Sequence, residues 1–584
     1  MAAAGTGEQQ PNGTTSAPPE SDTTTTTEEV STSFLNPVLR GFNPDPTICV
    51  VPARGSTPAT FFLSTSTFGY FPGCAIYTST NLVKWKLIGH ALNRRSQLDL
   101  RTVEPGAGSW ASTLRYRPDE KRFYLANGLF HRYRPATDER IFPRGFYVWT
   151  DNIWDDAAWS DPVYFDNPGF DQDLFWDDAV TPPKVYLSTT VRVADRQPNS
   201  TQKDFAIHIS EIDLPTGRTL TPPVVIRSSP FGIAEGSHII RRGGWYYLFT
   251  AEGGTEAGHQ EWVFRSRQGP LGPWEGTGKP LWYNGPDEEV QRTGHADVFE
   301  DGKGRWWAVL LGVRPVKVQG GEGTRWLEPQ LGRESFLVKV DWVDDWPVFN
   351  EGKNISLLTQ GRDHVPTESD SVEPIWRADL SGPELELGWY QKHTPTKRHY
   401  SLTERPGYLR LYGNCYDLSS PEAPAMLLRK QTSYTGEVFR VKMAFNPRKP
   451  GYEAGIVLWW NQYSYATVGL TAVTDLDTVY AKTVIVRTPT GRPGEMKVSD
   501  SLIGSPKYDG EVELSIRCLE TGYNIKIWAG KLYHSSFVAA EDLTVAPPVG
   551  GTFAGVMYGV YSFGRGEPVL DPVDFRDISV TRGK

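Results

Sequence analysis

The sequence has little of what marks several common classes of protein. Its 584 residues include only four cysteines, Cys49, Cys74, Cys415 and Cys518, and no two of them form a CxxC pair. That number is too small for a disulfide scaffold or a cysteine-rich zinc site. No apolar run reaches the roughly 18 residues that a membrane-spanning helix needs. HExxH, Walker A and Rossmann-type GxGxxG motifs are also missing, which removes the usual zinc-protease and nucleotide-binding signatures.

Positive charge is not in excess either. The chain carries 60 Lys and Arg against 69 Asp and Glu, which gives a formal net charge of −9. Proteins that bind nucleic acids usually show a basic patch or a basic domain. We therefore expect neither a nucleic acid nor a membrane as a partner.

Aromatic and turn-forming residues are abundant instead. The chain contains 20 Trp, 26 Tyr and 26 Phe, together with 57 Gly and 45 Pro. No long stretch keeps the 3.6-residue hydrophobic period of a helix. This combination predicts an all-β protein with many turns and with flat aromatic surfaces of the kind that commonly bind sugar rings.

The first 34 residues differ from the rest. They contain a run of threonines from Thr23 to Thr27 and hardly any large apolar side chain. Such a segment cannot bury enough surface to offset its ordering entropy, so residues 1–34 are predicted to be a disordered tail. The segment also lacks the apolar region of a signal peptide. As numbered, the sequence predicts an intracellular protein, with secretion as the alternative.

A repeat of about 61 residues begins near residue 35. Short aromatic strands recur around Leu63, Leu125, Leu187, Leu248 and Val309, at intervals of 62, 62, 61 and 61 residues. Each is followed by a second strand that leads into a turn. Five unrelated meanders in a large sandwich would not keep this spacing, so we predict a five-bladed β-propeller over residues 35–350.

The repeat stops after residue 350. Residues 351–372 are polar and rich in turn residues, and we interpret them as a linker. Residues 373–584 again contain only predicted strands. In the strand from Glu511 to Cys518, apolar and polar residues alternate, as in a sheet with one buried face. A jelly-roll-like β-sandwich is therefore predicted, with Cys518 in its core.

Each repeat contributes one candidate site residue. In a propeller the first strand of each blade lines the axis, so residues at similar distances before the five anchors converge. These candidates are Asp45, Trp110, Asp171, Glu235 and His295. Singly, each has a structural explanation, such as a turn aspartate or a hydrogen-bonded histidine. Three converging carboxylates raise at least one pKa, and glycosidic hydrolysis needs one protonated and one ionised carboxyl group.

The segment from Asn36 to Pro46 (NPVLRGFNPDP) resembles the opening motif of glycoside hydrolase family 43, in the branch of two-domain β-xylosidases and α-L-arabinofuranosidases. The resemblance extends over about residues 35–584, with further matches at 71–73, 110–116, 170–178, 235–238, 293–295, 332–336 and 400–407. Departures occur at Ser112 and Ser237, where proline is usual, and at Gln172-Asp173, where Pro-Ser is common. They imply a pocket rim that differs from that of common members.

The resemblance implies roles for individual residues. Asp45 would be the general base, Glu235 the general acid, and Asp171 the residue that orients the acid and tunes its pKa. The sugar pocket would be shaped by Phe68, Trp110, Phe170, His295 and Arg314. Members of the family invert, which implies working carboxyl groups about 6.5–9.5 Å apart. No cofactor is expected to be required. Calcium stays open, because His295 is similar to a position that contacts calcium through water in some members.

The sequence thus predicts an exo-acting, inverting glycosidase that releases D-xylose, L-arabinose or both from xylo-oligosaccharides or arabinoxylan. One alternative is an α-L-arabinofuranosidase without xylosidase activity. An alternative from another class is a non-catalytic carbohydrate-binding propeller, which the retention of all three carboxylates disfavours. A phosphorylase or transglycosylase on the same fold is a further option. We also expect the second domain to dock through an apolar interface and help form the site, with Tyr558–Gly564 reaching the rim.

Overall fold

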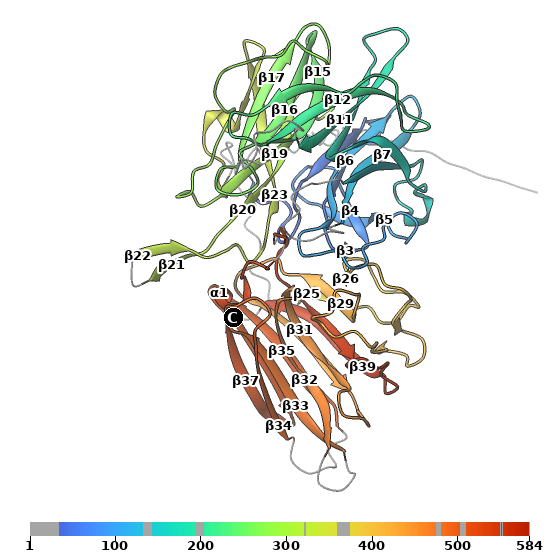
Figure 1. Ribbon diagram of the computed structural model, residues 1–584, viewed down its shortest axis with the longest axis vertical. Helices are drawn as coiled ribbons and strands as arrows, with labels where there is room; N and C mark the ends of the chain where they lie inside the picture. Colours follow the sequence, from blue (N-terminus) through green and yellow to red (C-terminus); the bar gives the residue numbers. More distant parts are fainter. Residues whose placement is uncertain are drawn as a thin grey trace, which may run out of the picture.

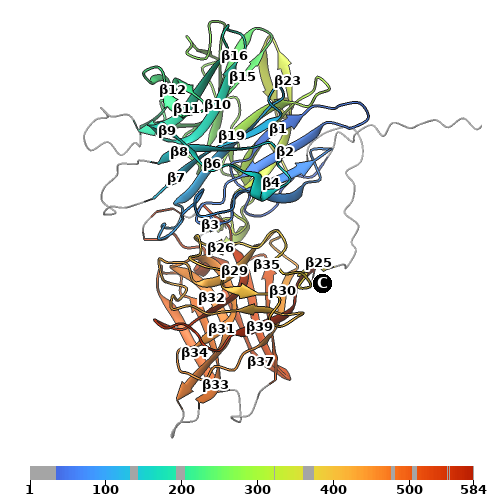
Figure 2. The ribbon, with the colours of Figure 1, turned by 90° about the vertical axis from the view of Figure 1, so that its right-hand side faces the viewer.

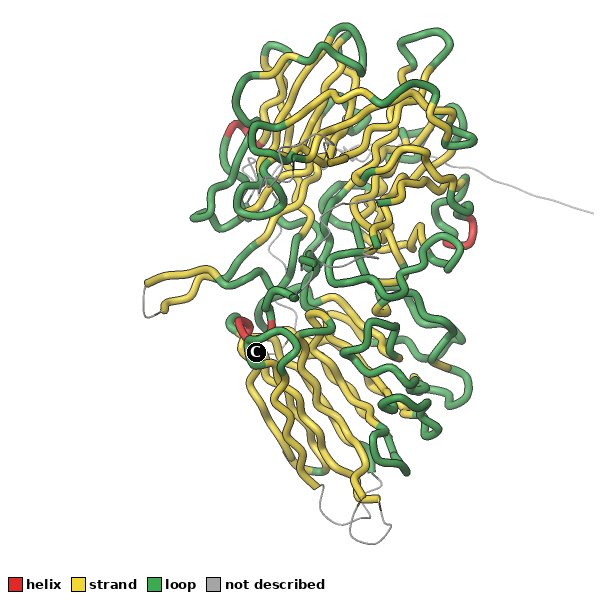
Figure 3. The backbone as a smooth tube through the Cα atoms, in the orientation of Figure 1, coloured by secondary structure: helices red, strands yellow, loops and turns green. Residues whose placement is uncertain are grey.

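The computed structural model describes residues 34–131, 143–192, 204–320, 323–358, 374–474, 480–502, 510–548, 550–551 and 553–582. The predicted tail, up to residue 33, and most of the predicted linker, residues 359–372, lie outside them. The chain forms two bodies of strands, one above the other in Figures 1 and 2. Among the described residues, helix is confined to short pieces (Figure 3): η1 (Asp156–Ala158), η2 (Asn350–Gly352) and α1 (Ala540–Leu543). None of the described helices is long and apolar enough to cross a membrane.

Five antiparallel sheets follow one another along the first body. Blade one contains β1 (Thr47–Val51), β2 (Thr60–Thr65), β4 (Gly73–Ser79) and β5 (Lys86–Leu92). Blade two contains β6 (Gly108–Arg117), β7 (Arg122–Phe130), β8 (Arg144–Thr150) and β9 (Val163–Pro168). Blade three contains β10 (Phe170–Asp177), β11 (Lys184–Arg192), β12 (Phe205–Asp213), β13 (Arg218–Thr219) and β14 (Val224–Ser228). Blade four contains β15 (Ala234–Arg242), β16 (Trp245–Glu252), β17 (Gln260–Ser266) and β18 (Glu275–Gly276). Blade five contains β19 (Gln291–Glu300), β20 (Trp306–Val313), β23 (Glu334–Val343) and β24 (Trp346–Phe349).

The predicted five-bladed propeller is confirmed. The five anchor residues are fully buried, each in the second strand of its blade: Leu63, Leu125, Leu187, Leu248 and Val309. The first strands contact one another in a ring, β1 with β6, β6 with β10, β10 with β15, β15 with β19, and β19 with β1. These five strands therefore surround the axis, as the sequence predicts.

The segment before β1 closes this ring against blade five. Leu39 forms a β-bridge with Ser335. The side chain of Asn36 donates to the carbonyl oxygen of Leu337 (2.9 Å) and accepts from its N–H (3.0 Å). Closure fixes the chain that leads directly to Asp45. A hairpin of β21 (Lys317–Gly320) and β22 (Gly323–Trp326) projects from the same blade (Figure 1).

Two antiparallel sheets form the second body, which confirms the predicted sandwich. The larger sheet contains β25 (Pro374–Arg377), β27 (Tyr400–Ser401), β28 (Leu409–Leu411), β30 (Glu437–Ala444), β35 (Val512–Leu519), β36 (Gly522–Ala529), β37 (Lys531–Ala539) and β39 (Val573–Arg582). The smaller contains β29 (Ala425–Lys430), β31 (Glu453–Asn461), β32 (Ser464–Thr474), β33 (Tyr480–Pro489), β34 (Met496–Leu502) and β38 (Met557–Phe563). Cys518 is a fully buried core thiol, and all four cysteines are free.

An apolar interface joins the two bodies, as expected. Strand β26 (Gln391–Lys392) of the second body pairs with β3 (Tyr70–Phe71) of the propeller, across the junction in Figure 1. Around this pair, one buried cluster unites propeller and sandwich residues, among them Phe42, Phe68, Tyr390 and Trp459. The sandwich is thus docked beside the segment that carries Asp45.

Candidate active site

A pocket of about 310 Å³ lies at the convergence point of the first strands. It is lined by the five residues predicted from the repeat, namely Asp45, Trp110, Asp171, Glu235 and His295. Phe68 and Phe170, also predicted, line the same pocket. One candidate per blade therefore does converge, and the aromatic rings form apolar walls beside three carboxyl groups.

Irregular backbone aims these side chains into the pocket. The pairing register breaks after Trp110 in β6, after Phe170 in β10, after Glu235 in β15 and twice in β19. Such bulges bend a strand and redirect a side chain. Asp45, Asp171 and His295 also have φ values of 52°, 53° and 56°, a region that side-chain-bearing residues rarely adopt. Strained backbone of this kind tends to gather at functional sites.

Asp171 lies close to the other two carboxyl groups of the pocket. Burial, followed by the carboxylates of Glu235 and Asp45, raises the pKa of Asp171 well above its usual range. Its Oδ2 accepts a hydrogen bond of 2.9 Å from the backbone N–H of Gly236. Because Gly236 directly follows Glu235, this bond ties Asp171 to the strand that carries the predicted acid.

Asp45 has a different environment. The Nη1 of Arg333 donates to its Oδ1 (3.0 Å) and to the hydroxyl of Thr255 (3.0 Å). The Nδ1 of His295 lies 3.7 Å from the same Asp45 oxygen. Burial lowers the pKa of His295 to about 3, so this imidazole is neutral near pH 7. Arg333 therefore supplies the positive charge beside the predicted base. One carboxylate held by a cation and a second pair of carboxyl groups suit acid–base cleavage of a glycosidic bond.

Comparison with known proteins decides the family. The model of glycosyl hydrolases family 43 matches residues 34–347, and that of the beta xylosidase C-terminal concanavalin A-like domain matches residues 377–581. The chain belongs to glycoside hydrolase family 43. It is therefore a glycosidase, of a family whose members invert the anomeric configuration.

Individual relatives match most of this chain. A non-reducing end alpha-L-arabinofuranosidase of Bacteroides ovatus is 32% identical over 554 residues, which are 93% of this chain and 94% of that protein. A xylan 1,3-beta-xylosidase of a Vibrio species is 31% identical over 453 residues, covering 76% and 80%. The crystal structure of a xylan beta-1,4-xylosidase from Bacillus halodurans superimposes with a TM-score of 0.77 at 26% identity, covering 94% of this chain and 100% of that one.

Arg314 is not among the residues that line the pocket of this family 43 enzyme, which corrects the prediction from the resemblance. Its guanidinium donates to both carboxylate oxygens of Glu334, at 2.7 and 2.8 Å. Glu334 also accepts a hydrogen bond of 2.7 Å from the N–H of Gly41. Arg314 therefore braces blade five against the segment before Asp45. Arg333 lines the pocket instead. It lies in the stretch 332–336 that resembles the family, and this resemblance could have identified it from the sequence.

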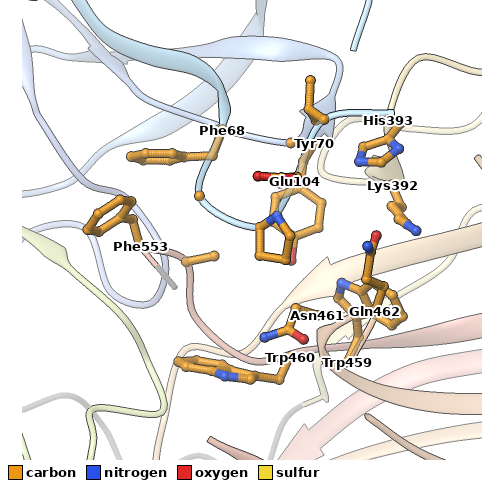
Figure 4. Close-up of a pocket in the computed structure, with 15 residues that line it drawn as sticks. Phe68, Tyr70, Glu104, Lys392, His393, Trp459, Trp460, Asn461, Gln462 and Phe553 are labelled. Carbon is orange, nitrogen blue, oxygen red and sulfur yellow. The ribbon is translucent and has the colours of Figure 1, made fainter. Parts of the chain in front are cut away.

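The sandwich contributes Phe553 to the pocket. The Phe553 ring lies 5.8 Å from that of Phe68, and the guanidinium of Arg333 lies 5.5 and 5.2 Å from these two rings, respectively. Figure 4 looks into the neighbouring depression at the domain junction and shows Phe68 and Phe553 together on one side of it. The predicted rim segment, Tyr558–Gly564, is instead largely the buried strand β38, and Phe553 lies just before that strand.

Removing the Phe553 ring should weaken the apolar contact between the pocket and the substrate. We expect Phe553→Ala to lower kcat/KM about tenfold, because losing on the order of 1.4 kcal/mol of apolar contact corresponds to that factor. Steady-state kinetics on a small aryl glycoside measures the change. Phe537→Ala, which truncates an exposed phenylalanine on β37 of the same domain, is the matched control. Equal kinetics for Phe553→Ala and the wild type would contradict a wall role.

A second polar layer lies beside His295 along the axis and draws one residue from each blade: Thr47, Arg115, Asp173, His238 and Asp297. The guanidinium of Arg115 contacts Asp173 (3.0 Å), Asp297 (2.7 Å) and the Nδ1 of His238 (3.1 Å). The His238 ring is 5.6 Å from that of His295. Asp173 stands at one of the departures from the family pattern, and it supplies a counter-charge for Arg115.

This layer does not fit a calcium ion. Calcium prefers six to eight oxygen ligands. The carboxylates of Asp173 and Asp297 are already bound by Arg115, and they accept hydrogen bonds from the N–H groups of Ile239 (3.1 Å) and Ile48 (3.0 Å). A fixed guanidinium would also repel a cation placed beside His295. Within the described ranges no cluster of three metal-ligating side chains occurs.

Proposed function

We propose that the enzyme is an exo-acting β-D-xylosidase that also releases terminal α-L-arabinofuranose, with xylo-oligosaccharides or arabinoxylan as substrates. The observation that carries this proposal is a three-carboxylate pocket walled by aromatic rings and bounded on one side by Phe553 of the second domain. Such a pocket suits one terminal sugar better than a long chain lying across the propeller. Relatives named for each of the two activities support the dual specificity.

In the proposed mechanism, Asp45 removes a proton from a water molecule that attacks the anomeric carbon. The glycosidic C–O bond breaks as Glu235 transfers its proton to the leaving oxygen. Asp171 holds the strand of the acid through the N–H of Gly236. Burial and the neighbouring carboxylates raise the pKa of Asp171 well above its usual range, so the pocket favours retention of a carboxyl proton, and the proposal assigns its delivery to the leaving oxygen to Glu235.

Two aryl glycosides test the function. The purified protein is incubated with 4-nitrophenyl β-D-xylopyranoside and with 4-nitrophenyl α-L-arabinofuranoside, and proton NMR follows the first anomer released. We expect turnover of both, with α-xylose as the initial product of the xyloside. Turnover of the arabinofuranoside alone would favour the alternative of an α-L-arabinofuranosidase without xylosidase activity. A folded protein that cleaves neither would refute the proposal.

We also propose that catalysis needs no divalent cation, because Arg115 provides a fixed positive charge on the axis. Treatment with EDTA followed by gel filtration should leave both kcat/KM and the melting temperature unchanged, and added calcium chloride should change neither. Terbium luminescence provides a direct binding measurement that does not depend on activity. A loss of activity that calcium restores, or saturable terbium binding that calcium displaces, would contradict this prediction.

A further inference from the structure

Asn43 connects the predicted base to its surroundings. Its backbone N–H donates to the carbonyl oxygen of Arg333 (2.9 Å), and its carbonyl oxygen accepts from the hydroxyl of Ser335 (2.7 Å). The side chain of the same Arg333 donates to Asp45 (3.0 Å), two residues after Asn43. Asn43 and Asp45 are therefore fixed to one common residue, and a shift of Asn43 would be transmitted to the Asp45 carboxylate.

The side chain of Asn43 is held from both domains. Its Oδ1 accepts hydrogen bonds from the hydroxyl of Tyr77 in the propeller (2.7 Å) and from the Nζ of Lys430 in the sandwich (2.9 Å). Lys430 is the last residue of β29, and its Nζ also lies 5.5 Å from the ring of Phe42 and 5.0 Å from that of Tyr390. The Lys430–Asn43 bond thus crosses the domain interface to reach the segment that carries the base.

Placing Lys430 in an apolar interface lowers the stability of the folded protein. Burial lowers the pKa of Lys430 to about 7. Among the residues that the structure describes, no carboxylate offsets this effect of burial, and an uncompensated buried charge is destabilising. Methionine or leucine at this position would pack better if the interface served only to hold the two domains together. Residues that lower stability in this way are often retained for function.

We propose that Lys430 is a positioning residue for hydrolysis, through which the second domain sets the orientation of Asp45. The inference rests on the proposed role of Asp45 as the base. Lys430 touches neither the substrate nor the reacting atoms in this account. It acts by fixing the amide of Asn43, and through Asn43 the backbone that leads to the base.

Lys430→Met in the full-length enzyme tests this role. We expect kcat to fall about tenfold with KM within about twofold of the wild type, since small displacements of a catalytic group slow the chemical step. The melting temperature should stay the same or rise, because a buried ammonium group is removed. Lys430→Arg, which keeps a donor, should recover part of the loss. The matched control is Lys392→Met. Lys392 is a second buried interfacial lysine, and it bonds the carbonyl oxygen of Ser420 and lies 5.6 Å from the ring of Trp459.

The outcomes separate this inference from the proposed function. An inactive wild type would refute the function itself. An active wild type with unchanged kcat in Lys430→Met would overturn the positioning role alone, as would equal losses in Lys430→Met and Lys392→Met, which would indicate general loosening of the interface. If Lys430→Met proves insoluble, Lys430→Gln is judged by the same criteria, because its shorter side chain also withdraws the donor from Asn43.

Discussion

Replacing Asp45 with asparagine should lower kcat on the aryl β-xyloside by about 10²–10⁴-fold, the range that a general base usually contributes. An amide of the same shape cannot accept the proton of the attacking water, although its oxygen can still accept a hydrogen bond from Arg333. Sugar affinity should therefore change little. Steady-state kinetics and calorimetric titration with xylose measure the two quantities separately.

The control for Asp45→Asn is Asp166→Asn, which changes an exposed aspartate on the outer strand β9 and should leave kinetics unaltered. Wild-type turnover in Asp45→Asn would place the base elsewhere. The same pair of proteins also addresses the alternative of a binding module. If wild type and variant bind xylose alike and neither hydrolyses any glycoside, the propeller binds sugars without cleaving them.

Glu235→Gln should produce the second large loss, and its size should depend on the leaving group. On xylobiose we expect about 10²–10⁴-fold, because the departing sugar oxygen needs a proton. On the nitrophenyl glycoside the loss should be at least tenfold smaller, since nitrophenolate departs readily as an anion. A series of aryl xylosides with graded phenol acidity measures this dependence.

Asp171→Asn provides the contrast for the Glu235 experiment. It removes the carboxylate that accepts from Gly236 but keeps the proton donor, so its loss of kcat should vary less across the aryl series. If Glu235→Gln were impaired equally on every leaving group, proton donation by Glu235 would be wrong. If only Asp171→Asn showed a steep dependence, the acid assignment would move to Asp171.

The architecture could be predicted because the repeat is a local pattern. Every blade fully buries an aliphatic anchor residue in its second strand, and these anchors recur at nearly constant spacing, as Leu63 and Leu125 illustrate. The first strands share one axis, so residues at similar distances before the anchors had to meet there. Asp45, Asp171 and Glu235 could therefore be placed together without knowledge of any contact.

The remaining pocket residues do not lie at these regular distances before the anchor residues. Arg333 precedes β23, the third strand of blade five, and Thr255 lies in the loop between β16 and β17. Phe553 comes from the other domain. Their positions depend on ring closure and on domain docking, which leave no period in the sequence. Arg314 was misplaced for a related reason, because its partner Glu334 becomes a neighbour only when β20 and β23 pair.

The long-range hydrogen bonds around Asp45 also bear on the stage of folding at which the enzyme becomes active. Asp45 and its partner Arg333 are 288 residues apart in the chain, and Asn43 and Lys430 are 387 apart. Contacts at such separations form late, because loop closure costs entropy before the contact stabilises it. During synthesis, blade one leaves the ribosome long before the strand that carries Lys430 exists. In refolding, β structure should therefore appear before hydrolysis, and the delay between the two signals would time the docking of the domains. We therefore expect full activity only after the second domain has been synthesised and has docked on the propeller.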